Sequence, residues 1–308
     1  MTNEYNTESY SGYVVKEDIS PSSILVDWKG KEPADVSAYD ADEDVVVYKR
    51  TVRTDGYQEG EEIELSMTVR YHKDAPQPEP CVLFIPGGGF FICIPEILLH
   101  TQQYLTLEGY AVVAASYRLA GEGLVWDMLE DIRDALAFVK ENAGRYNIDP
   151  ERICLMGDSA SGYLVSLAAT KERLDVKAVV DFYGPSDLLN VAEDHDEETQ
   201  KAWFNPLSVL NHIVNGVFSE CSLYDTPEKA EELNPIAYVD GTEPPFLFMQ
   251  GSEDPEVSPS QTGWFHETLR EKGADSTRYL LAGTGHGGHD FECDEAMDAL
   301  IAFLSRTV

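Results

Sequence analysis

Short apolar runs alternate along the chain with longer stretches whose apolar residues recur every three or four positions. The runs at 81–85, 178–182 and 245–250 are largely apolar throughout, which is typical of parallel strands buried on both faces. This alternation predicts an α/β fold with a mostly parallel sheet flanked by helices. One predicted helix carries its apolar residues on a single face: Trp126, Leu129, Ile132, Leu136 and Val139.

Two segments depart from this rhythm. The stretches 45–52 and 63–69 alternate apolar and polar residues around a turn containing Asp55 and Gly56, which predicts an antiparallel pair at the start of the sheet. Residues 188–233 form an acidic insertion that contains aromatic residues and has no clear strand. With 308 residues in total, we expect a single domain carrying this insertion.

The first 45 residues are polar and acidic, with apolar side chains at 24–26 and at Trp28 that could dock onto the remainder. We expect a partly ordered segment that could lie over the entrance of a site. The first residues carry neither the basic start nor the apolar stretch of a secretory signal. The five cysteines are an odd number without framework spacing. Together these features predict a reducing, cytoplasmic location.

The net charge is strongly negative. Lys and Arg number 22 and Asp and Glu 56, so the formal charge is −34 at pH 7. Nucleic acids and anionic membranes require basic patches, and we therefore expect neither as a partner. No apolar run approaches the roughly 20 residues that span a bilayer. The charge acts mainly on solubility, and its field would disfavour anionic substrates relative to neutral or cationic ones.

The most informative segment is an apolar strand that runs into Gly-Asp-Ser-Ala at 157–160 and then into a helix near Gly162. A serine on such a turn exposes its hydroxyl at the carboxyl edge of the sheet. The N–H of the next residue, Ala160, is then free to bind an oxyanion. Ser159 is therefore the candidate nucleophile, although the common pattern has glycine where this chain has Ser161.

A nucleophilic serine needs a histidine to take its proton and a carboxylate to orient that histidine. One apolar run ends in a loop with three carboxylates, Glu253, Asp254 and Glu256, and spacing alone does not choose among them. The next predicted strand is followed by His286 and His289, and His286 follows it more directly. Since the carboxyl ends of parallel strands converge on one crevice, the order serine, acid, histidine brings the three together.

A glycine-rich loop supplies the fourth part. The apolar run 81–85 opens onto Pro-Gly-Gly-Gly-Phe at 86–90, where consecutive glycines allow a tight turn with exposed N–H groups. This loop contains neither G-x-G-x-x-G nor Gly-Lys-Ser/Thr, the phosphate-binding patterns, so it is better interpreted as half of an oxyanion hole. Phe90 and Phe91 are either core residues or substrate-binding residues in the wall of an acyl pocket.

These features resemble the α/β-hydrolase superfamily, in the branch of hormone-sensitive-lipase-like, bacterial acetyl-esterase-like and feruloyl-esterase-like carboxylesterases. The resemblance spans roughly residues 80–305, and its specificity comes from the joint order of the motifs. The matching motifs are Pro86-Gly-Gly-Gly-Phe90, Asp149-Pro-Glu-Arg-Ile153, Gly157-Asp-Ser-Ala160, Tyr183-Gly-Pro-Ser-Asp187, Asn234-Pro-Ile-Ala-Tyr238, Gly251-Ser-Glu-Asp254 and Gly285-His-Gly287.

The resemblance implies a complete catalytic site and two departures from the family pattern. Pro86 stands where the lipase-like members have histidine, and Ser161 replaces a glycine that lets the helix pack closely. It also implies that the insertion 188–233 forms a small helical cap over the crevice. The implied site residues are nucleophile Ser159, acid Asp254, base His286 and the oxyanion-hole N–H groups of Gly88, Gly89 and Ala160.

The expected activity is hydrolysis of carboxylic esters through an acyl-serine intermediate. The resemblance implies short acyl groups such as acetyl, carried by sugars or a xenobiotic alcohol. The partner is a small-molecule ester, no cofactor is implied, and association into a homo-oligomer stays open. We expect no metal, because the spacing of His286, His289 and the nearby carboxylates matches no standard zinc pattern.

Two other functions compete with this expectation. An amidase or formamidase would use the same serine, acid and histidine, and only its substrates would set it apart. A non-catalytic ligand-binding relative would keep the fold, but such relatives have typically lost one of the three residues, and all three are present here.

Overall fold

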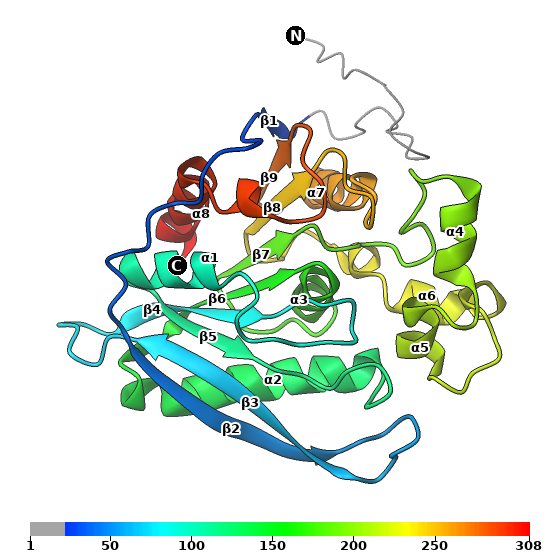
Figure 1. Ribbon diagram of the computed structural model, residues 1–308, viewed down its shortest axis with the longest axis horizontal. Coiled ribbons are helices and arrows are strands. Elements are labelled where there is room, and N and C mark those ends of the chain that lie inside the picture. The colour runs from blue at the N-terminus through cyan, green and yellow to red at the C-terminus, as the bar shows by residue number, and fades with distance from the viewer. Residues whose placement is uncertain (1–21) are drawn as a thin grey trace.

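A twisted sheet forms the centre of the computed structural model, which describes residues 22–308 (Figure 1). Its strand order is β1-β9-β8-β7-β6-β4-β5-β3-β2, and all neighbours are parallel except at the β5-β3-β2 edge, where both pairings are antiparallel. The strands are β1 (Ile24–Val26), β2 (Asp42–Val52), β3 (Glu62–Tyr71), β4 (Glu79–Ile85), β5 (Ala111–Ala115), β6 (Ile148–Asp158), β7 (Ala178–Phe182), β8 (Phe246–Gly251) and β9 (Ser276–Leu281).

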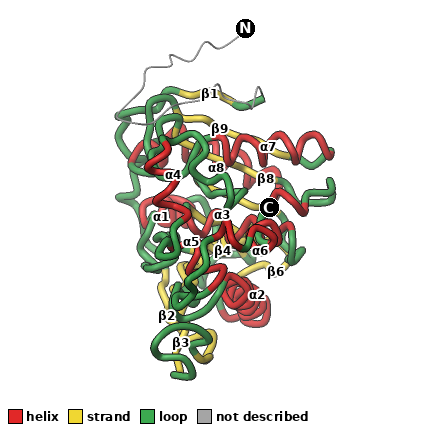
Figure 2. Tube along the Cα trace, turned by 90° about the vertical axis from the view of Figure 1, so that its right-hand side faces the viewer, coloured by secondary structure: helices red, strands yellow, loops and turns green. Residues whose placement is uncertain are grey.

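Helices flank the strands on both sides (Figure 2). One core cluster joins the sheet to α2, α3 and α7, and a second joins the opposite face to α1 and α8. The predicted α/β fold is confirmed. The helices are α1 (Leu99–Leu107), α2 (Val125–Asn142), α3 (Ala160–Thr170), α4 (Glu197–Phe204), α5 (Val209–Asn215), α6 (Pro227–Glu232), α7 (Ser260–Lys272) and α8 (Asp294–Thr307), with short 3₁₀ turns η1 (Ala143–Arg145), η2 (Leu223–Asp225), η3 (Pro235–Tyr238) and η4 (His289–Phe291).

Strand β4 shows why the apolar runs are continuous. Cys81, Leu83 and Ile85 belong to the cluster under α2 and α3, whereas Val82 and Phe84 belong to the cluster under α1 and α8. Because successive side chains of a strand point to opposite faces, a strand buried on both faces needs apolar residues at every position.

The elements predicted at the start of the chain are present, with corrections. The antiparallel pair is β2 and β3, joined by residues 53–61. The predicted helix is α2, but Trp126 does not lie on its buried face. Trp126 is 40% exposed, with Lys171 Nζ 5.0 Å from its ring centroid, because Val125 and Met128 occupy the buried positions of that turn.

The N-terminal segment docks at the β9 edge of the sheet. Residues 24–26 form β1, a strand that the sequence pattern did not identify, and pair in parallel with β9. Trp28 is buried, with its ring 5.6 Å from that of Tyr279, so the expected docking at this residue is confirmed. Residues 1–21, on which the expectation of a segment over the site mainly depends, lie outside the described residues.

The insertion 188–233 leaves the sheet at the carboxyl end of β7 and contains α4, α5 and α6, which lie together in Figure 1. It is tied to the connection between β2 and β3, because the Val217 N–H donates to Asp55 Oδ2 at 3.0 Å. The rings of Phe218 and Tyr57 also meet edge-on, with centroids 4.5 Å apart. Its role as a cap stays a prediction. Among residues 22–308, no helix combines the length and apolar character needed to cross a membrane.

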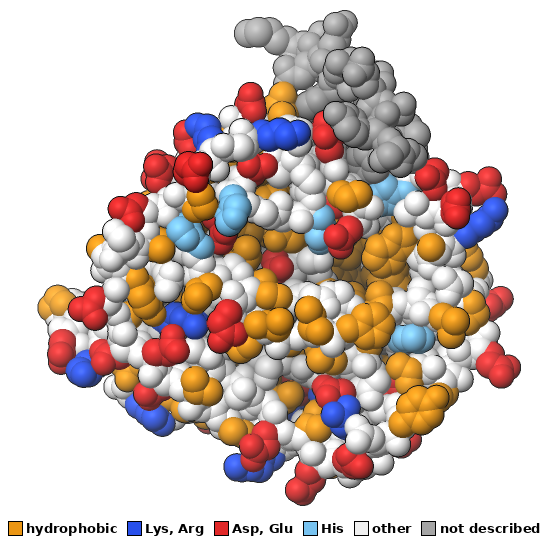
Figure 3. Space-filling model, in the orientation of Figure 1, with side chains coloured by type: hydrophobic (Ala, Val, Ile, Leu, Met, Phe, Trp, Pro, Cys, Tyr) orange, Lys and Arg blue, Asp and Glu red, His pale blue; other side chains and the backbone are white. Residues whose placement is uncertain are grey.

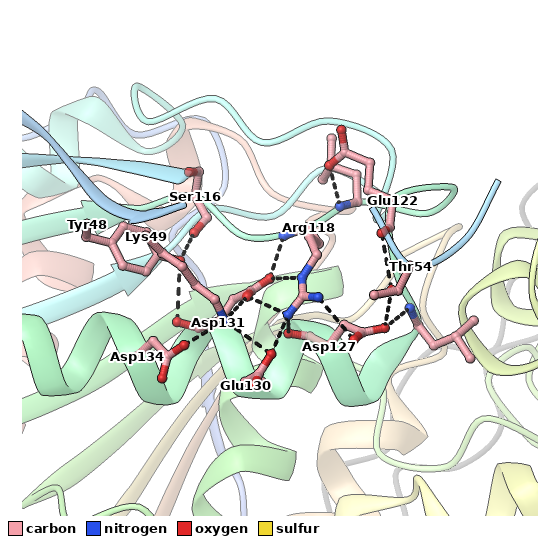
Figure 4. Close-up of polar contacts among 12 residues, drawn as sticks. Tyr48, Lys49, Thr54, Ser116, Arg118, Glu122, Asp127, Glu130, Asp131 and Asp134 are labelled. Atoms are coloured by element: carbon pink, nitrogen blue, oxygen red, sulfur yellow. Dashed lines mark hydrogen bonds and ion pairs between the residues drawn. The ribbon is translucent and has the colours of Figure 1, made fainter. Parts of the chain in front are cut away.

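A buried ion-pair network fixes the loop that follows β5 to helix α2 (Figure 4). The Arg118 guanidinium is almost fully buried and donates to both carboxylate oxygens of Asp131, at 2.9 and 2.8 Å. Asp127 and Glu130 accept from the same guanidinium. Two residues further on, the Ala120 N–H donates to the carbonyl of Phe90 at 2.8 Å, so this network also supports the glycine-rich loop.

Replacing Arg118 should destabilise the protein strongly. We expect Arg118→Met to lower the free energy of unfolding by about 3 kcal/mol, because it leaves the buried Asp131 without its main partner. Arg133, like Asp131, lies on α2, and Arg133→Met, which removes its solvent-exposed pair with Glu172, should cost at most about 1 kcal/mol. Urea unfolding of both variants measures the difference, and equal losses would contradict the assigned role of the network.

Candidate active site

The turn between β6 and α3 presents Ser159. The backbone of Ser159 has φ 50° and ψ −121°, a conformation that non-glycine residues rarely adopt. Its N–H donates to the Phe182 carbonyl of the neighbouring strand at 2.8 Å. A Cβ at Gly157 would lie 2.3 Å from the carbonyl oxygen of Ser161, so only glycine fits where the chain enters the turn. The turn therefore exists because of these local contacts.

Ser159, His286 and Asp254 form a continuous hydrogen-bonded chain. His286 Nε2 lies 2.8 Å from Ser159 Oγ, and His286 Nδ1 lies 2.7 Å from Asp254 Oδ2. Since the carboxylate can only accept, Nδ1 carries the ring hydrogen and Nε2 offers its lone pair to the serine hydroxyl. The structure thus brings together the three residues implied by the resemblance.

Asp254 is distinguished from the other carboxylates of its loop by burial and by its donors. Its side chain is fully buried, and its Oδ2 accepts from Gln250 Nε2 at 2.8 Å. Its Oδ1 accepts the N–H groups of Glu256 and Val257 at 2.8 and 2.9 Å. These bonds hold the carboxylate in place toward His286, whereas the Glu256 side chain remains 64% exposed. His289 is directed elsewhere, 3.7 Å from Glu292 and largely exposed.

Opposing effects set the pKa of His286. Burial alone would lower this pKa, but the hydrogen bond and negative charge of Asp254, followed by the charges of Glu256 and Asp158, raise it above the usual 6.5. His266 is buried as well, and its ring nitrogens lie within hydrogen-bond distance of the hydroxyls of Ser22 and Ser276. Burial, aided by the Arg278 charge, lowers its pKa to about 4.

The glycine-rich loop lies against the serine turn. The Gly87 N–H donates to Asp158 Oδ1 at 2.7 Å, and a Cβ at Gly87 would come within 2.4 Å of the Asp158 carbonyl oxygen. Burial raises the pKa of Asp158 to about 6. Within residues 22–308, the N–H groups of Gly88, Gly89 and Ala160 donate to no protein acceptor, so they are available to a ligand.

Ser161 adds a second link between the loop and the turn. It is fully buried, and its hydroxyl donates to the Pro86 carbonyl at 2.7 Å, with Tyr117 Oη at 3.1 Å. The close helix packing expected of a glycine here is provided by Gly162, whose Cβ would lie 3.0 Å from the Cα of Gly184. The fold therefore accommodates a serine at position 161, and the serine hydroxyl adds a hydrogen bond to the glycine-rich loop.

The two predicted substrate-binding phenylalanines differ. Phe90 is buried in the main core, with its ring centroid 6.0 Å from that of Tyr163, so it is a core residue rather than part of a pocket wall. Phe91 is 53% exposed near His212 of α5, which leaves it available to line a crevice.

Tyr183 is a neighbour of the site that the sequence reasoning did not assign. Its ring lies 4.6 Å from that of His286, and its backbone has a positive φ of 48°. It stands directly after the predicted strand 178–182, in the motif Tyr183-Gly-Pro-Ser-Asp187. Its place at the carboxyl end of a predicted parallel strand was the feature of the sequence that could have indicated a position near the site.

The geometry can be compared with known proteins. The model of the BD-FAE family matches residues 67–269, about two thirds of the chain. The chain belongs to the BD-FAE family. This family membership confirms the resemblance to α/β-hydrolase carboxylesterases that the sequence motifs indicated.

Relatives of similar sequence carry esterase names. The chain is 27% identical to Esterase LipQ of Mycobacterium tuberculosis over 224 residues and 26% identical to Esterase LipC of the same organism over 300 residues. These alignments cover 68% and 92% of the chain, but only 50% of LipQ and 70% of LipC, so the chain spans about half the length of LipQ.

Solved structures share the fold of this BD-FAE member. A truncated carbohydrate esterase from gut microbiota superposes with a TM-score of 0.71 at 20% identity, covering 90% of this chain and 99% of that one. Esterase 2 of Thermogutta terrifontis superposes with a TM-score of 0.65 at 17% identity, covering 89% and 94%. At these identities the likeness concerns the fold.

His286 and His266 should titrate in different pH ranges. Side-chain NMR should give His286 a pKa above 6.5 and His266 a pKa near 4, because His286 hydrogen-bonds to Asp254 whereas burial has the largest effect on His266. In Asp254→Asn, the pKa of His286 should fall while that of His266 stays in place. A His286 pKa below 6.5 in the wild type would contradict the pairing with Asp254.

Proposed function

We propose that the chain is a serine-dependent carboxylic ester hydrolase for short acyl groups of the acetyl type. The observation that carries this proposal is the chain of two short hydrogen bonds from Ser159 through His286 to the buried Asp254, next to N–H groups that find no acceptor among residues 22–308. The esterase names of LipQ and LipC support the reaction class.

In the acylation step, Ser159 Oγ attacks the carbonyl carbon of the ester while His286 Nε2 takes the hydroxyl proton. Asp254 stabilises the imidazolium that forms. The negative charge that develops on the carbonyl oxygen is met by N–H groups of Gly88, Gly89 and Ala160, and one such donor is typically worth about 3 kcal/mol of the barrier. The C–O bond to the alcohol then breaks, and the imidazolium gives its proton to the leaving oxygen.

Deacylation repeats the same chemistry with water. His286 removes a proton from a water molecule, the resulting hydroxide attacks the acyl-serine, and the acid leaves as Ser159 regains its proton. Because His286 must be neutral to start each half-reaction, kcat/KM falls as the pH drops through its raised pKa.

For the alcohol part, acetylated carbohydrates are the substrates we propose to examine first. The support is the carbohydrate esterase from gut microbiota, which shares this fold. The acyl preference comes from the resemblance to acetyl esterases.

Activity should depend on one serine and not on its neighbour. With p-nitrophenyl acetate, Ser159→Ala should lower kcat by at least about 10⁴-fold. Ser161→Ala should cost at most about tenfold, because its hydroxyl bonds Pro86 and not the reacting atoms. Turnover should also decrease from acetate to decanoate.

The contrary outcomes are specific. Undiminished turnover in Ser159→Ala would remove the proposed nucleophile. Faster cleavage of acetamides than of matched acetate esters would favour the amidase alternative over the esterase.

A further inference from the structure

One carboxylate next to the catalytic nitrogen takes no part in the hydrogen-bonded chain. Glu256 Oε2 lies 3.8 Å from His286 Nε2, the same nitrogen that is 2.8 Å from Ser159 Oγ. The Glu256 backbone is fixed because its N–H donates to Asp254 Oδ1. Its side chain is 64% exposed, so a molecule that approaches His286 Nε2 from solvent can come close to this charge.

This position lies on the leaving-group side of the reaction. In the proposed mechanism His286 Nε2 hands its proton to the alcohol oxygen, so that oxygen must come within hydrogen-bond distance of Nε2. Substituents two carbons away from the oxygen are then within a few ångströms of the Glu256 carboxylate. The acyl group, in contrast, extends from the carbonyl carbon held between Ser159 and the glycine-rich loop.

The loops at the carboxyl ends of the central strands carry no positive charge that would offset Glu256. Those after β4, β7, β8 and β9 contain no Lys or Arg. Arg118, on the loop after β5, is buried and paired with three carboxylates. Lys29, next to Gly283, belongs to the β1 edge of the sheet. In Figure 3 the hollow on this face is lined by hydrophobic side chains, with blue basic side chains standing apart from it. The cation-free loops are 86–98, 183–196, 252–259 and 282–288.

We propose that Glu256 is a specificity-determining residue that selects the leaving alcohol by charge. Alcohols with a cationic group close to the ester oxygen are preferred over neutral alcohols of the same shape, and anionic alcohols are disfavoured. The proposal rests on the proposed esterase function. Because Glu256 is exposed to solvent, the preference is modest, about two- to fivefold in kcat/KM, and it declines as salt screens the charge.

The test uses esters that differ in charge but hardly in shape. Acetylcholine and 3,3-dimethylbutyl acetate share the same skeleton, with a quaternary nitrogen in one and a carbon in the other. The anionic ester 4-acetoxybutyrate provides the third charge state. The ratio of kcat/KM for acetylcholine to that for dimethylbutyl acetate is measured at low and at 1 M salt. Because both esters meet the same enzyme, any change in His286 protonation cancels in the ratio.

Glu256→Gln should bring this ratio down to about one and raise kcat/KM for 4-acetoxybutyrate by about two- to fivefold. The control is Glu271→Gln, which makes the same change of charge near the C-terminal end of α7. This position precedes the amino end of β9, whereas the site lies at the carboxyl ends of the strands. Its ratio should equal that of the wild type.

Failure of this inference is distinct from failure of the proposed function. Equal ratios in the wild type and Glu256→Gln, with ester turnover that still requires Ser159, would overturn the charge selection and leave the esterase intact. A loss of preference in Glu271→Gln as well would assign the effect to net charge and would equally overturn the role of Glu256. Absence of any Ser159-dependent turnover would overturn the esterase itself.

Discussion

The backbone of Ser159, at φ 50° and ψ −121°, is a conformation that its neighbours must hold in place. They do so by close contact. There is no room for a side chain at position 157, and the Ser159 N–H donates to the Phe182 carbonyl of β7. Both ties from the glycine-rich loop, through Asp158 and through Ser161, end within two residues of this serine. The proposed nucleophile and the proposed oxyanion donors are therefore held next to one another at this turn.

The carboxylates near the site have different roles, which depend on their burial and on their hydrogen-bond donors. Asp254 is buried and surrounded by hydrogen-bond donors, so it orients His286. Asp158 is also buried but accepts from Gly87, and burial raises its pKa to about 6. Glu256 keeps its contact with solvent, and its Oε2 lies 3.8 Å from His286 Nε2. Burial and the available donors decide these roles, whereas the total charge does not.

The sequence predicted those parts of the structure that depend on periodicity and on the order of motifs. The continuous apolar runs correspond to β4, β7 and β8, and the serine, the acid and the histidine follow the carboxyl ends of β6, β8 and β9. Residue-level packing was harder to predict. Trp126, predicted on the buried face of its helix, is 40% exposed, and the sequence left Phe90 open between core and pocket wall, because a pattern of apolar residues does not say which side chain faces the core. The roles of Ser161 and Tyr183 depend on contacts between segments distant in the chain, which spacing along the chain does not encode.

The central claim is that folding makes the Ser159 hydroxyl nucleophilic, and covalent labelling tests it most directly. The folded protein is incubated with a fluorophosphonate, and the modified peptide is identified by mass spectrometry. The account predicts one adduct per chain, on Ser159, formed much more slowly in His286→Ala and not at all after unfolding in urea. No adduct on the folded protein, or an adduct on another residue with Ser159 unmodified, would contradict it.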